Sequence, residues 1–424
     1  MSTRAVISGL GVVAPTGVGA RPYWRATVAG HNGIRAVGGP GASGSPLVPA
    51  GEVTGFDAAR WIDDTLRAQT DRRTWFALAA AEMALADAAL RPADHPPFHL
   101  SVVTAGGSGG SGGSGGDESA GARAVARPAA APGEAETHPS LAWFHAAAAA
   151  RISIRHGLTG GGVVVAADGA GGLDALKHAW RLLRRGGKAV IVGGTEAPLP
   201  PCAPARGSTP DRTYRGTDPE RAYLPFSPHA SGFVPGEGGA LMVLEEKAHA
   251  AERGVRGYAE LLGHAATHDA HDHTAPAPDG VQLARAVTTA LEQAGRAPED
   301  VDVVFADGAG DPAGDAAEAA ALHRVFGDRL ARVLVTVPKA GVGRLACGGG
   351  ALDTVTAALA LRTGIVPPTR GGDPRAAREH YGIRLVTRWT RPERLTTAVV
   401  LARGAGGFNS AVVLGSLDAD DSSF

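Results

Sequence analysis

A glycine-rich turn between an apolar strand and a helix is the clearest place in this sequence for a reactive group. The turn covers residues 168–172 (DGAGG), and the predicted helix continues from Leu173. The free N–H groups at a helix N-terminus stabilise developing negative charge, and a thiol placed there would have a lowered pKa. The turn contains neither cysteine nor serine, so it has the position of a nucleophile without the nucleophile. Asp168 could act there as a carboxylate base.

Two cysteines, Cys202 and Cys347, place thiols elsewhere in the chain. Neither belongs to a CxxC pair, so the sequence shows no cysteine-based zinc motif and no disulfide framework. Cys347 lies in glycine-rich sequence and could be a substitute nucleophile, although free cysteine more often packs as a small apolar residue. Cys202 stands among prolines with no base nearby in the sequence, which argues against a reactive thiol.

Imidazole and carboxylate groups are dense in one short stretch. They are His264, His268, Asp269, His271, Asp272 and His273. Such a cluster can bind a metal ion, and an i, i+4 pair can do so from a helix. Residues 274–276 (TAP) interrupt any helix there. We therefore predict no metal site, and no motif indicates a cofactor.

Alternating strands and helices must position the glycine turn, and this alternation predicts an α/β fold. Apolar runs predict strands at 5–8, 99–104, 162–167, 188–193, 241–246, 301–306 and 334–337, and Ala- and Leu-rich stretches predict helices at 71–89, 140–151, 173–183, 314–326 and 351–361. The run at 162–167 is continuously apolar, so we expect a fully buried strand. Arg181, Arg184 and Arg185 end the helix after the turn, where cations complement the helix dipole or could dock an acidic carrier protein.

Two segments repeat one order of residues. GAGGLDALKHA at 169–179 and CGGGALDTVTAA at 347–358 each place Gly-Gly, a Leu-Asp pair and an Ala-rich helix in the same order. This similarity suggests two related halves that meet near Gly254. Another segment, about 105–136, contains GGSGGSGGSGG at 106–116. It is too poor in apolar residues to order itself, so we predict a flexible insertion, natural or engineered.

Composition narrows the class of protein. The 424 residues include 41 Lys and Arg against 42 Asp and Glu, a net charge of −1, which argues against a nucleic-acid partner held by a large basic surface. No apolar run approaches the roughly 20 residues of a membrane helix, and the N-terminus lacks the features of a signal peptide. We expect a cytoplasmic protein with no nucleic-acid and no membrane partner.

Six segments spread over nearly the whole chain together carry a family resemblance. They are AVISGLGVVAPTG at 5–17, GAGGLDALKHA at 169–179, SGFVPGEGGALMVLE at 231–245, DAHDHTAPAPDG at 269–280, PKAGVGRLACGGGALD at 338–353 and GAGGFNSAVV at 404–413. The chain is similar to the β-ketoacyl synthase family of the thiolase-like fold. The resemblance implies two related halves in stacked αβαβα layers, an N-terminal half at 1–254 and a C-terminal half at 255–424.

The family condenses acyl chains with one cysteine and two histidines, and the resemblance places each of them on another residue here. The Cys of GCTxGLDA falls on Gly169, the His of HGTST on Asp307, and the His of KxxxGH on Arg344. Glycine cannot carry an acyl thioester, a carboxylate does not replace a neutral imidazole, and arginine stays charged and cannot act as a base. We therefore predict that this chain has no catalytic residue.

Other matched positions surround this degenerate site. Lys339, Asp315 and Glu318 match the family's polar network behind the active site. The two threonines of HGTST, which in the family hold a pantetheine arm, fall on Ala309 and Asp311.

A loop near the degenerate site combines Asp168 with the turn Gly404, Ala405 and Gly406. In the family this turn reads GFGG, and its gating Phe falls on Ala405. The change would remove a mobile gate, which an inactive subunit would not need.

The chain keeps the family's scaffold segments, but its catalytic residues are replaced. In this it resembles the chain length factor, or ketosynthase β subunit, of bacterial type II polyketide synthases, which serve antibiotic biosynthesis. SIRHGLTG at 153–160 and GGFNS at 406–410 look closer to that subfamily than to active synthases. The resemblance implies a heterodimer with a catalytic ketosynthase and a polyketide on the phosphopantetheine of an acyl carrier protein. A tunnel between the subunits would set the chain length. Most chain length factors carry Gln at the position of Gly169, where it is proposed to assist malonyl decarboxylation, so that role is not implied here.

Two other hypotheses remain open at this point. The chain could be a stand-alone malonyl decarboxylase or acyltransferase with residual activity that uses Asp168, Asp307 or Cys347. It could also be a scaffold subunit that contributes no tunnel.

Overall fold

The computed structural model describes residues 3–38, 47–106, 146–198 and 212–417. Cys202 and most of the predicted insertion at about 105–136 lie outside these residues, so the predictions made for them stay predictions. The helix expected at 140–151 is described only from residue 146 onward.

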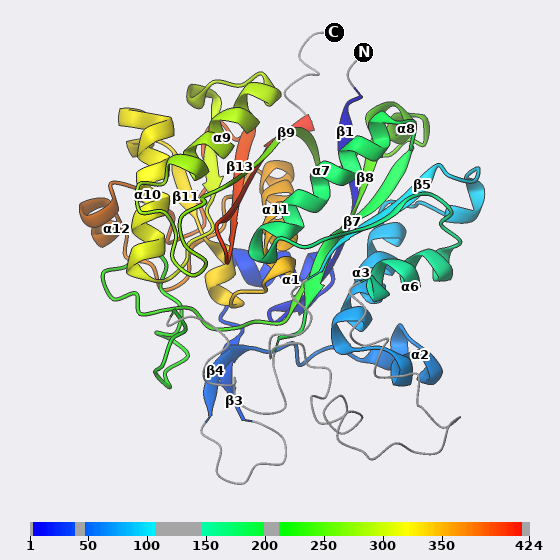
Figure 1. The fold of residues 1–424 in the computed structure, drawn as a ribbon, viewed down its shortest axis with the longest axis horizontal. Helices are drawn as coiled ribbons and strands as arrows, with labels where there is room; N and C mark the ends of the chain where they lie inside the picture. Colours follow the sequence, from blue (N-terminus) through cyan, green and yellow to red (C-terminus); the bar gives the residue numbers. More distant parts are fainter. Residues whose placement is uncertain (1–2, 39–46, 107–145, 199–211, 418–424) are drawn as a thin grey trace.

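One mixed sheet of 12 strands forms the centre of the protein, in the order β12-β11-β10-β13-β14-β9-β1-β8-β7-β5-β6, with β2 paired to β1 (Figure 1). Its strands are β1 (Ala5–Ala14), β2 (Gly17–Val18), β5 (Leu100–Ala105), β6 (Gly162–Val165), β7 (Ala189–Glu196), β8 (Gly238–Glu246), β9 (Ala259–His268), β10 (Val303–Phe305), β11 (Leu334–Thr336), β12 (Arg384–Leu385), β13 (Thr397–Gly404) and β14 (Phe408–Gly415). A separate hairpin pairs β3 (Ile34–Val37) with β4 (Val48–Gly51).

The two halves of this sheet have the same topology. The first half uses β1, β5, β6, β7 and β8, and the second uses β9, β10, β11, β13 and β14. In both, the order across the sheet is third, second, fourth, fifth and first strand. The first two pairings in this order are parallel, and the last two are antiparallel. The first strands meet where Ala5–Ile7 pairs with Ala259–Leu261. The predicted boundary after Gly254 falls between these halves and stays a prediction.

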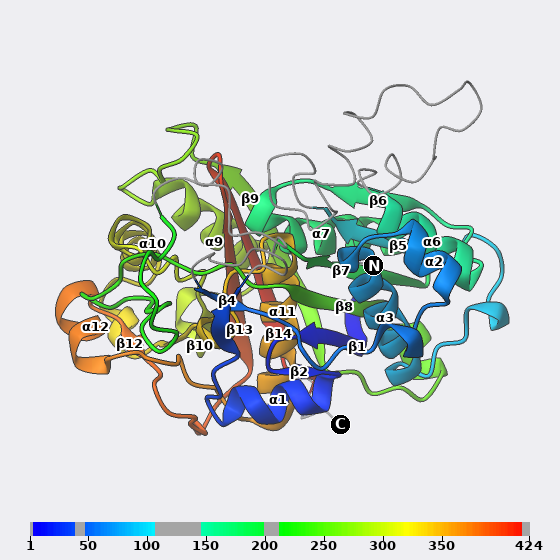
Figure 2. The ribbon, with the colours of Figure 1, turned by 90° about the horizontal axis from the view of Figure 1, so that it is seen from below.

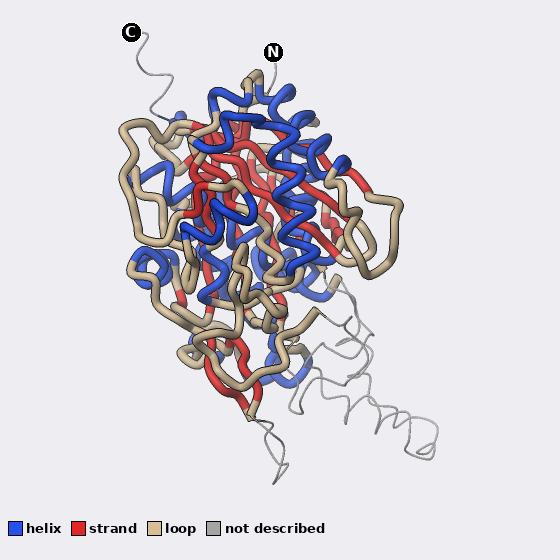
Figure 3. The backbone as a smooth tube through the Cα atoms, turned by 90° about the vertical axis from the view of Figure 1, so that its left-hand side faces the viewer, coloured by secondary structure: helices blue, strands red, loops and turns tan. Residues whose placement is uncertain are grey.

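Helices enclose the two halves of the sheet in five layers (Figures 1 and 3). α7 (Gly171–Arg184) and α11 (Cys347–Thr363) lie between the halves, α3 (Arg72–Asp87) and α6 (Ala147–His156) cover one outer face, and α9 (Val281–Ala294) and α10 (Pro312–Phe326) cover the other. Shorter helices are α1 (Ala20–Val28), α2 (Asp64–Gln69), α8 (Lys247–Glu252) and α12 (Pro374–Tyr381). Successive strand residues face different layers: Val400 packs toward α11, whereas Val399 and Leu401 pack toward α9 and α10. The predicted αβαβα stack is confirmed. No helix in the described ranges is long and apolar enough to cross a bilayer.

The first strand is longer than the sequence suggested. The strand was expected only over residues 5–8, but β1 continues through Gly9 and Gly11 to Ala14. A Cβ atom on Gly9 or Gly11 would come closer than 3.0 Å to a backbone carbonyl of α3. These glycines therefore permit close packing of a helix on a strand, and they do not mark a turn.

Two more elements differ from expectation. The helix expected at 351–361 begins earlier, at Cys347, and includes Gly348–Gly350. A Cβ atom on Gly348 would come closer than 3.0 Å to the carbonyl oxygen of Gly238, so glycine permits close backbone packing at that position. The strand expected to be fully buried, now β6, is an edge strand whose valines are half-buried. Its apolar run is therefore not explained by the described part of the chain, where no further strand pairs with its outer side.

Candidate functional site

Three separate segments bring the degenerate catalytic positions together. Gly169 lies in a short 3-10 turn (Asp168–Ala170) between β6 and α7, Asp307 follows β10, and Arg344 precedes α11. A Cβ atom on Gly169 would lie 3.7 Å from Nη2 of Arg344. The three positions therefore form one site, next to the N-termini of the two central helices.

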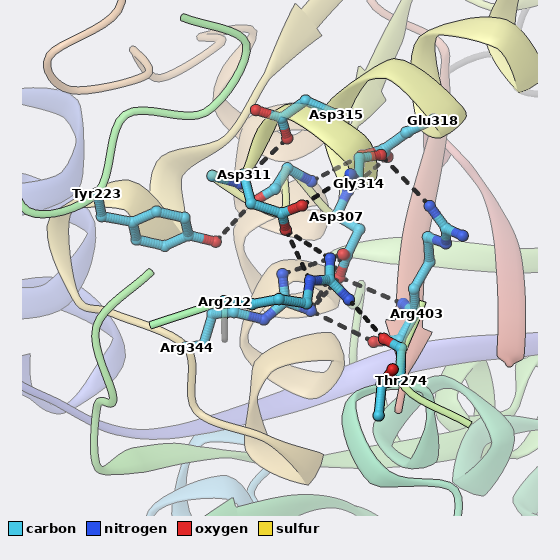
Figure 4. Close-up of polar contacts among 12 residues, drawn as sticks. Arg212, Tyr223, Thr274, Asp307, Asp311, Gly314, Asp315, Glu318, Arg344 and Arg403 are labelled. Carbon is cyan, nitrogen blue, oxygen red and sulfur yellow. Dashed lines mark hydrogen bonds and ion pairs between the residues drawn. The ribbon is translucent and has the colours of Figure 1, made fainter. Parts of the chain in front are cut away.

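Asp307 and Arg344 form a bidentate ion pair where the resemblance places two histidines (Figure 4). Nη1 and Nη2 of Arg344 donate to the carboxylate at 3.0 Å. Burial acts to raise the pKa of Asp307, but Arg344 and Lys339 outweigh it and lower that pKa to about 2. Burial acts to lower the pKa of Arg344, and Asp307 raises it above its ordinary value. Neither group exchanges a proton at neutral pH, so the pair cannot act as a general acid or base.

Lys339 extends the ion pair into a buried network. Its Nζ contacts Asp353 on α11 and lies 3.8 Å from Asp307. Burial raises the pKa of Asp353 to about 6, although Lys339 acts to lower it. Two cations and two carboxylates thus balance one another at neutral pH, which offsets the cost of removing charges from water.

α10 presents two further buried carboxyl groups to the loop that contains Asp307. Glu318 accepts hydrogen bonds from the N–H groups of Asp307 (2.7 Å) and Gly308 (2.8 Å), and Asp315 accepts one from Gly310 (3.1 Å). Burial raises the pKa of Asp315 to about 8; burial and the charge of Asp307 raise the pKa of Glu318 to about 7. Glu318 and Asp315 thus hold the backbone of the loop that contains Asp307, and Lys339 lies beside the Asp307 carboxylate. Their role as the family's polar network stays a prediction.

The turn at Gly404, Ala405 and Gly406 lies directly against the Gly169 turn. The carboxylate of Asp168 accepts a hydrogen bond from the N–H of Ala405 at 2.8 Å. A Cβ atom on Gly169 would come closer than 3.0 Å to the carbonyl oxygen of Arg403. The position expected to hold the nucleophile is therefore covered by backbone.

Sequence analysis did not identify Arg403 as part of this site. Its N–H donates to Asp307 at 3.2 Å, and its guanidinium pairs with Asp269 at 3.4 Å. Asp269 belongs to the His- and Asp-rich stretch, so that stretch contributes an anchor for Arg403. The only sequence signal for Arg403 is its place immediately before the GAGG turn.

Arg212 and Tyr223 were also missed. Nε of Arg212 donates to Asp311 at 2.9 Å, and the hydroxyl of Tyr223 donates to the carbonyl of Gly308 at 2.7 Å (Figure 4). Asp311 also caps α10 by accepting from the N–H of Gly314. Its capping role was visible in the spacing of DPAG at 311–314, but its distant cationic partner was not.

Cys347 is fully buried and has none of the properties of a nucleophile. Its Sγ lies 3.5 Å from the carbonyl oxygens of Ala105 and Thr195 and from the carboxyl group of Glu196. Burial, with the nearby Glu196, raises the pKa of the thiol well above its ordinary value. Although the thiol stands at the N-terminus of α11, it is protonated at neutral pH.

The four histidines do not gather into one group. His264 is buried in β9, where Nε2 lies 3.2 Å from Asp174 and 3.0 Å from Ser410. His268, His271 and His273 lie at the surface. Within the described ranges, no three His, Cys, Asp or Glu side chains are arranged to hold a metal ion. His264, Asp174 and Ser410 do not form a hydrolytic triad, because the serine and the aspartate both contact the same imidazole nitrogen.

Two family models cover most of the chain. The model of the β-ketoacyl synthase N-terminal domain matches residues 2–250, and that of the C-terminal domain matches residues 258–373. The chain belongs to the β-ketoacyl synthase family. The resemblance read from the six segments is confirmed.

Curated relatives within this family include polyketide β-ketoacyl synthases of two numbered types and a named ketoacyl synthase beta subunit. The ketoacyl synthase beta subunit of the tetracenomycin polyketide synthase of Streptomyces glaucescens is 46% identical over 96% of this chain and 97% of its own. In Streptomyces halstedii, polyketide beta-ketoacyl synthase 2 is 46% identical over 97% of each chain, whereas synthase 1 is 32% identical over 98% of each. This β-ketoacyl synthase homologue is thus most similar to the second type, and the resemblance to ketosynthase β subunits is confirmed.

Solved structures share the fold. The ishigamide ketosynthase/chain length factor matches with a TM-score of 0.80 at 25% identity, over 98% of this chain and 100% of that chain. A type II polyketide synthase acyl carrier protein in complex with its ketosynthase bound to the hexaketide matches with a TM-score of 0.80 at 26% identity and the same coverage. The predicted thiolase-like fold is confirmed.

Proposed function

We propose that the chain is a non-condensing chain length factor that forms a heterodimer with a catalytic ketosynthase. The Asp307–Arg344 ion pair carries this proposal, because it replaces two proton-transferring residues with charges that neutralise each other. Gly169 supplies no acyl acceptor. Condensation on an acyl carrier protein would therefore belong to the partner. Solved structures that share this fold include a ketosynthase/chain length factor and an acyl carrier protein in complex with its ketosynthase, which supports this assignment.

The strand β6 forms one edge of the central sheet, next to β5 (Figure 2), and its properties favour a partner chain at this edge. Its Val163–Val165 side chains are half-buried, and in the described structure its outer edge has no neighbouring strand. Phe98 and Ile154, which flank this end of the sheet on the β5 and α6 segments, are 74% and 73% exposed. An open strand edge with exposed apolar side chains is a surface that another chain can pair with.

Chain length would be set by the size of the space between the two subunits. A polyketide on the phosphopantetheine of the carrier protein would grow into this space until further extension causes a clash. Dispersion and overlap act over fractions of an ångström, so the packed walls of such a space discriminate between chain lengths.

The stand-alone enzyme receives less support. Asp307 is held by two cations, and Cys347 is buried with a raised pKa. The carboxylate of Asp168 accepts a hydrogen bond from the backbone N–H of Ala405 in the neighbouring turn. None of these groups is placed to attack or deprotonate a substrate.

Reconstitution tests the proposed function. The chain and a ketosynthase with an intact Cys and two His are purified separately and together, and malonyl-dependent condensation is assayed with an acyl carrier protein. We expect activity only from the pair, with product length changing when β-type subunits are exchanged. Condensation by this chain alone would overturn the proposal, and unchanged product length would favour a scaffold subunit without a tunnel.

A further inference from the structure

The degenerate site is closed by contacts within the chain itself. We propose that Asp168 and the Asp307–Arg344 pair latch the turn at residues 403–407 against the Gly169 turn, so that this subunit has no acyl pocket to restore. This inference deepens the proposed function and rests on it. It assigns Asp168 as a positioning residue for the contact that keeps the degenerate site closed.

Backbone packing supplies the closure. A Cβ atom on Gly169 would come closer than 3.0 Å to the carbonyl oxygen of Arg403, and one on Gly404 would come equally close to the carbonyl oxygen of Ala167. The backbones of the two turns are therefore in direct contact at Gly169 and at Gly404. A substrate could reach Gly169 only if residues 403–405 moved.

Three polar contacts oppose such a movement. Asp168 accepts from the N–H of Ala405 at 2.8 Å. Nη2 of Arg344 donates to the carbonyl of Arg403 at 3.3 Å, and the N–H of Arg403 donates to Asp307 at 3.2 Å. The ion pair that replaces the catalytic histidines thus also grips the backbone that covers the nucleophile position.

The backbone at the latch has an unusual conformation. Asp168 is a non-glycine residue with φ of 46°, and Gly406 and Gly407 have φ of 82° and 94°. A positive φ disfavours residues with a Cβ, and it persists where surrounding contacts compensate for it. The hydrogen bond from Ala405 is a contact of this kind, since it fixes the Asp168 side chain.

Hydrogen exchange of the full chain in complex with its ketosynthase tests the latch. We expect the Ala405 amide to exchange about tenfold or more faster in Asp168→Ala than in the parent, because a hydrogen bond to a charged acceptor is lost. Asp168→Asn keeps an acceptor oxygen and should restore protection. Asp63→Ala removes an equivalent carboxylate–amide bond at the start of α2 and should leave residues 403–407 unchanged. Equal exchange in the parent and Asp168→Ala would overturn the latch.

Condensation by the unmodified chain alone would instead contradict the proposed function and leave the exchange measurement valid.

Discussion

The N-termini of α7 and α11 occupy equivalent places in the two halves, yet they are inert for different reasons. Each follows a glycine-rich segment and carries a Leu-Asp pair in its first turns. At α7, Gly169 offers no side chain, and backbone covers the position. At α11, Cys347 offers a thiol whose pKa is raised by burial and by Glu196. A helix dipole therefore does not make a reactive site unless a suitable group and an open path are both present.

The electrostatic surroundings of the two helices also differ. Asp174 of α7 pairs with the neutral hydroxyl of Ser410 and with His264, whereas Asp353 of α11 pairs with Lys339. Only the second arrangement connects to the Asp307–Arg344 pair, through Lys339. The C-terminal half thus supplies nearly all of the charge that closes the degenerate site.

Removing the buried carboxylate of Asp307 should have the largest effect on stability of the changes considered for the two halves. Asp307→Ala leaves Arg344 and Lys339 without their shared carboxylate in a buried site, and it should lower the free energy of unfolding by about 3–5 kcal/mol. Denaturant titration monitored by circular dichroism measures the loss. The double variant Asp307→Ala/Arg344→Leu removes both charges and should lose less than the single variant. A single-variant loss below about 1 kcal/mol would show that the pair does not hold the site.

The pH dependence of stability tests the protonation of Asp315 and Glu318, two buried carboxyl groups of the C-terminal half. The folded-state pKa values of Asp315 (about 8) and Glu318 (about 7) lie above their ordinary values of 3.8 and 4.5. The unfolded chain therefore loses these protons at lower pH than the folded chain. Stability should fall from about pH 4 to pH 8, by up to about 1.4 kcal/mol per pH unit for each group, and then level off.

Urea titrations across this pH range measure the slope. Asp315→Asn should remove the contribution of Asp315, whereas Asp328→Asn, at an exposed carboxylate just after α10, should preserve the profile. Stability that is flat or rising between pH 4 and pH 8 in the parent would contradict the raised pKa values.

Matched glycine substitutions compare the two helix N-termini directly. In Gly169→Ala the new Cβ meets the carbonyl of Arg403 and should cost about 1–3 kcal/mol. In Gly349→Ala nothing lies within 4 Å of the new Cβ inside α11, so the higher helix propensity of alanine should stabilise the chain by about 0.5–1 kcal/mol. Thermal unfolding of both variants tests this prediction. Effects of the same sign and size would remove the distinction between the two turns.

The smallest effect is expected at Cys347. Iodoacetamide at pH 8 should leave this thiol unmodified in the folded chain and modify it after denaturation, as peptide mass spectrometry can show. Cys347→Ala should not change condensation by the reconstituted pair. Acylation or rapid alkylation of Cys347 in the folded chain would return the stand-alone enzyme to consideration.

Local sequence patterns were sufficient for most secondary structure. The helix expected at 71–89 is α3, which begins at Arg72 after the Asp71 cap, because Ala and Leu favour helix and no glycine interrupts them. The strand expected at 188–193 is β7, which extends to Glu196. The patterns failed at Gly9, Gly11 and Gly348–Gly350. At Gly9, Gly11 and Gly348 glycine permits close packing on backbone, which local propensity does not encode.

The sequence did not predict whether a strand lies at the edge or in the interior of the sheet. The apolar run at 162–167 predicted a buried strand, but β6 lies at the edge. Periodicity reports which side chains are apolar, and it does not report whether a neighbouring strand or another chain covers them. In the proposed heterodimer the partner would cover this run. The apolar side chains of β6 would then account both for the wrong prediction of a buried strand and for the proposed interface.

The sequence by itself determined which chemical groups this chain lacks. The resemblance places Gly169, Asp307 and Arg344 at the positions of the family's cysteine and histidines, and no arrangement of the backbone turns these residues into an acyl acceptor and a proton shuttle. Only the tertiary structure decided that Asp307 and Arg344, 37 residues apart, neutralise each other and that residues 403–405 cover Gly169. Ion pairing and steric closure depend on distance and burial, which segments remote in sequence acquire only when the two halves pack.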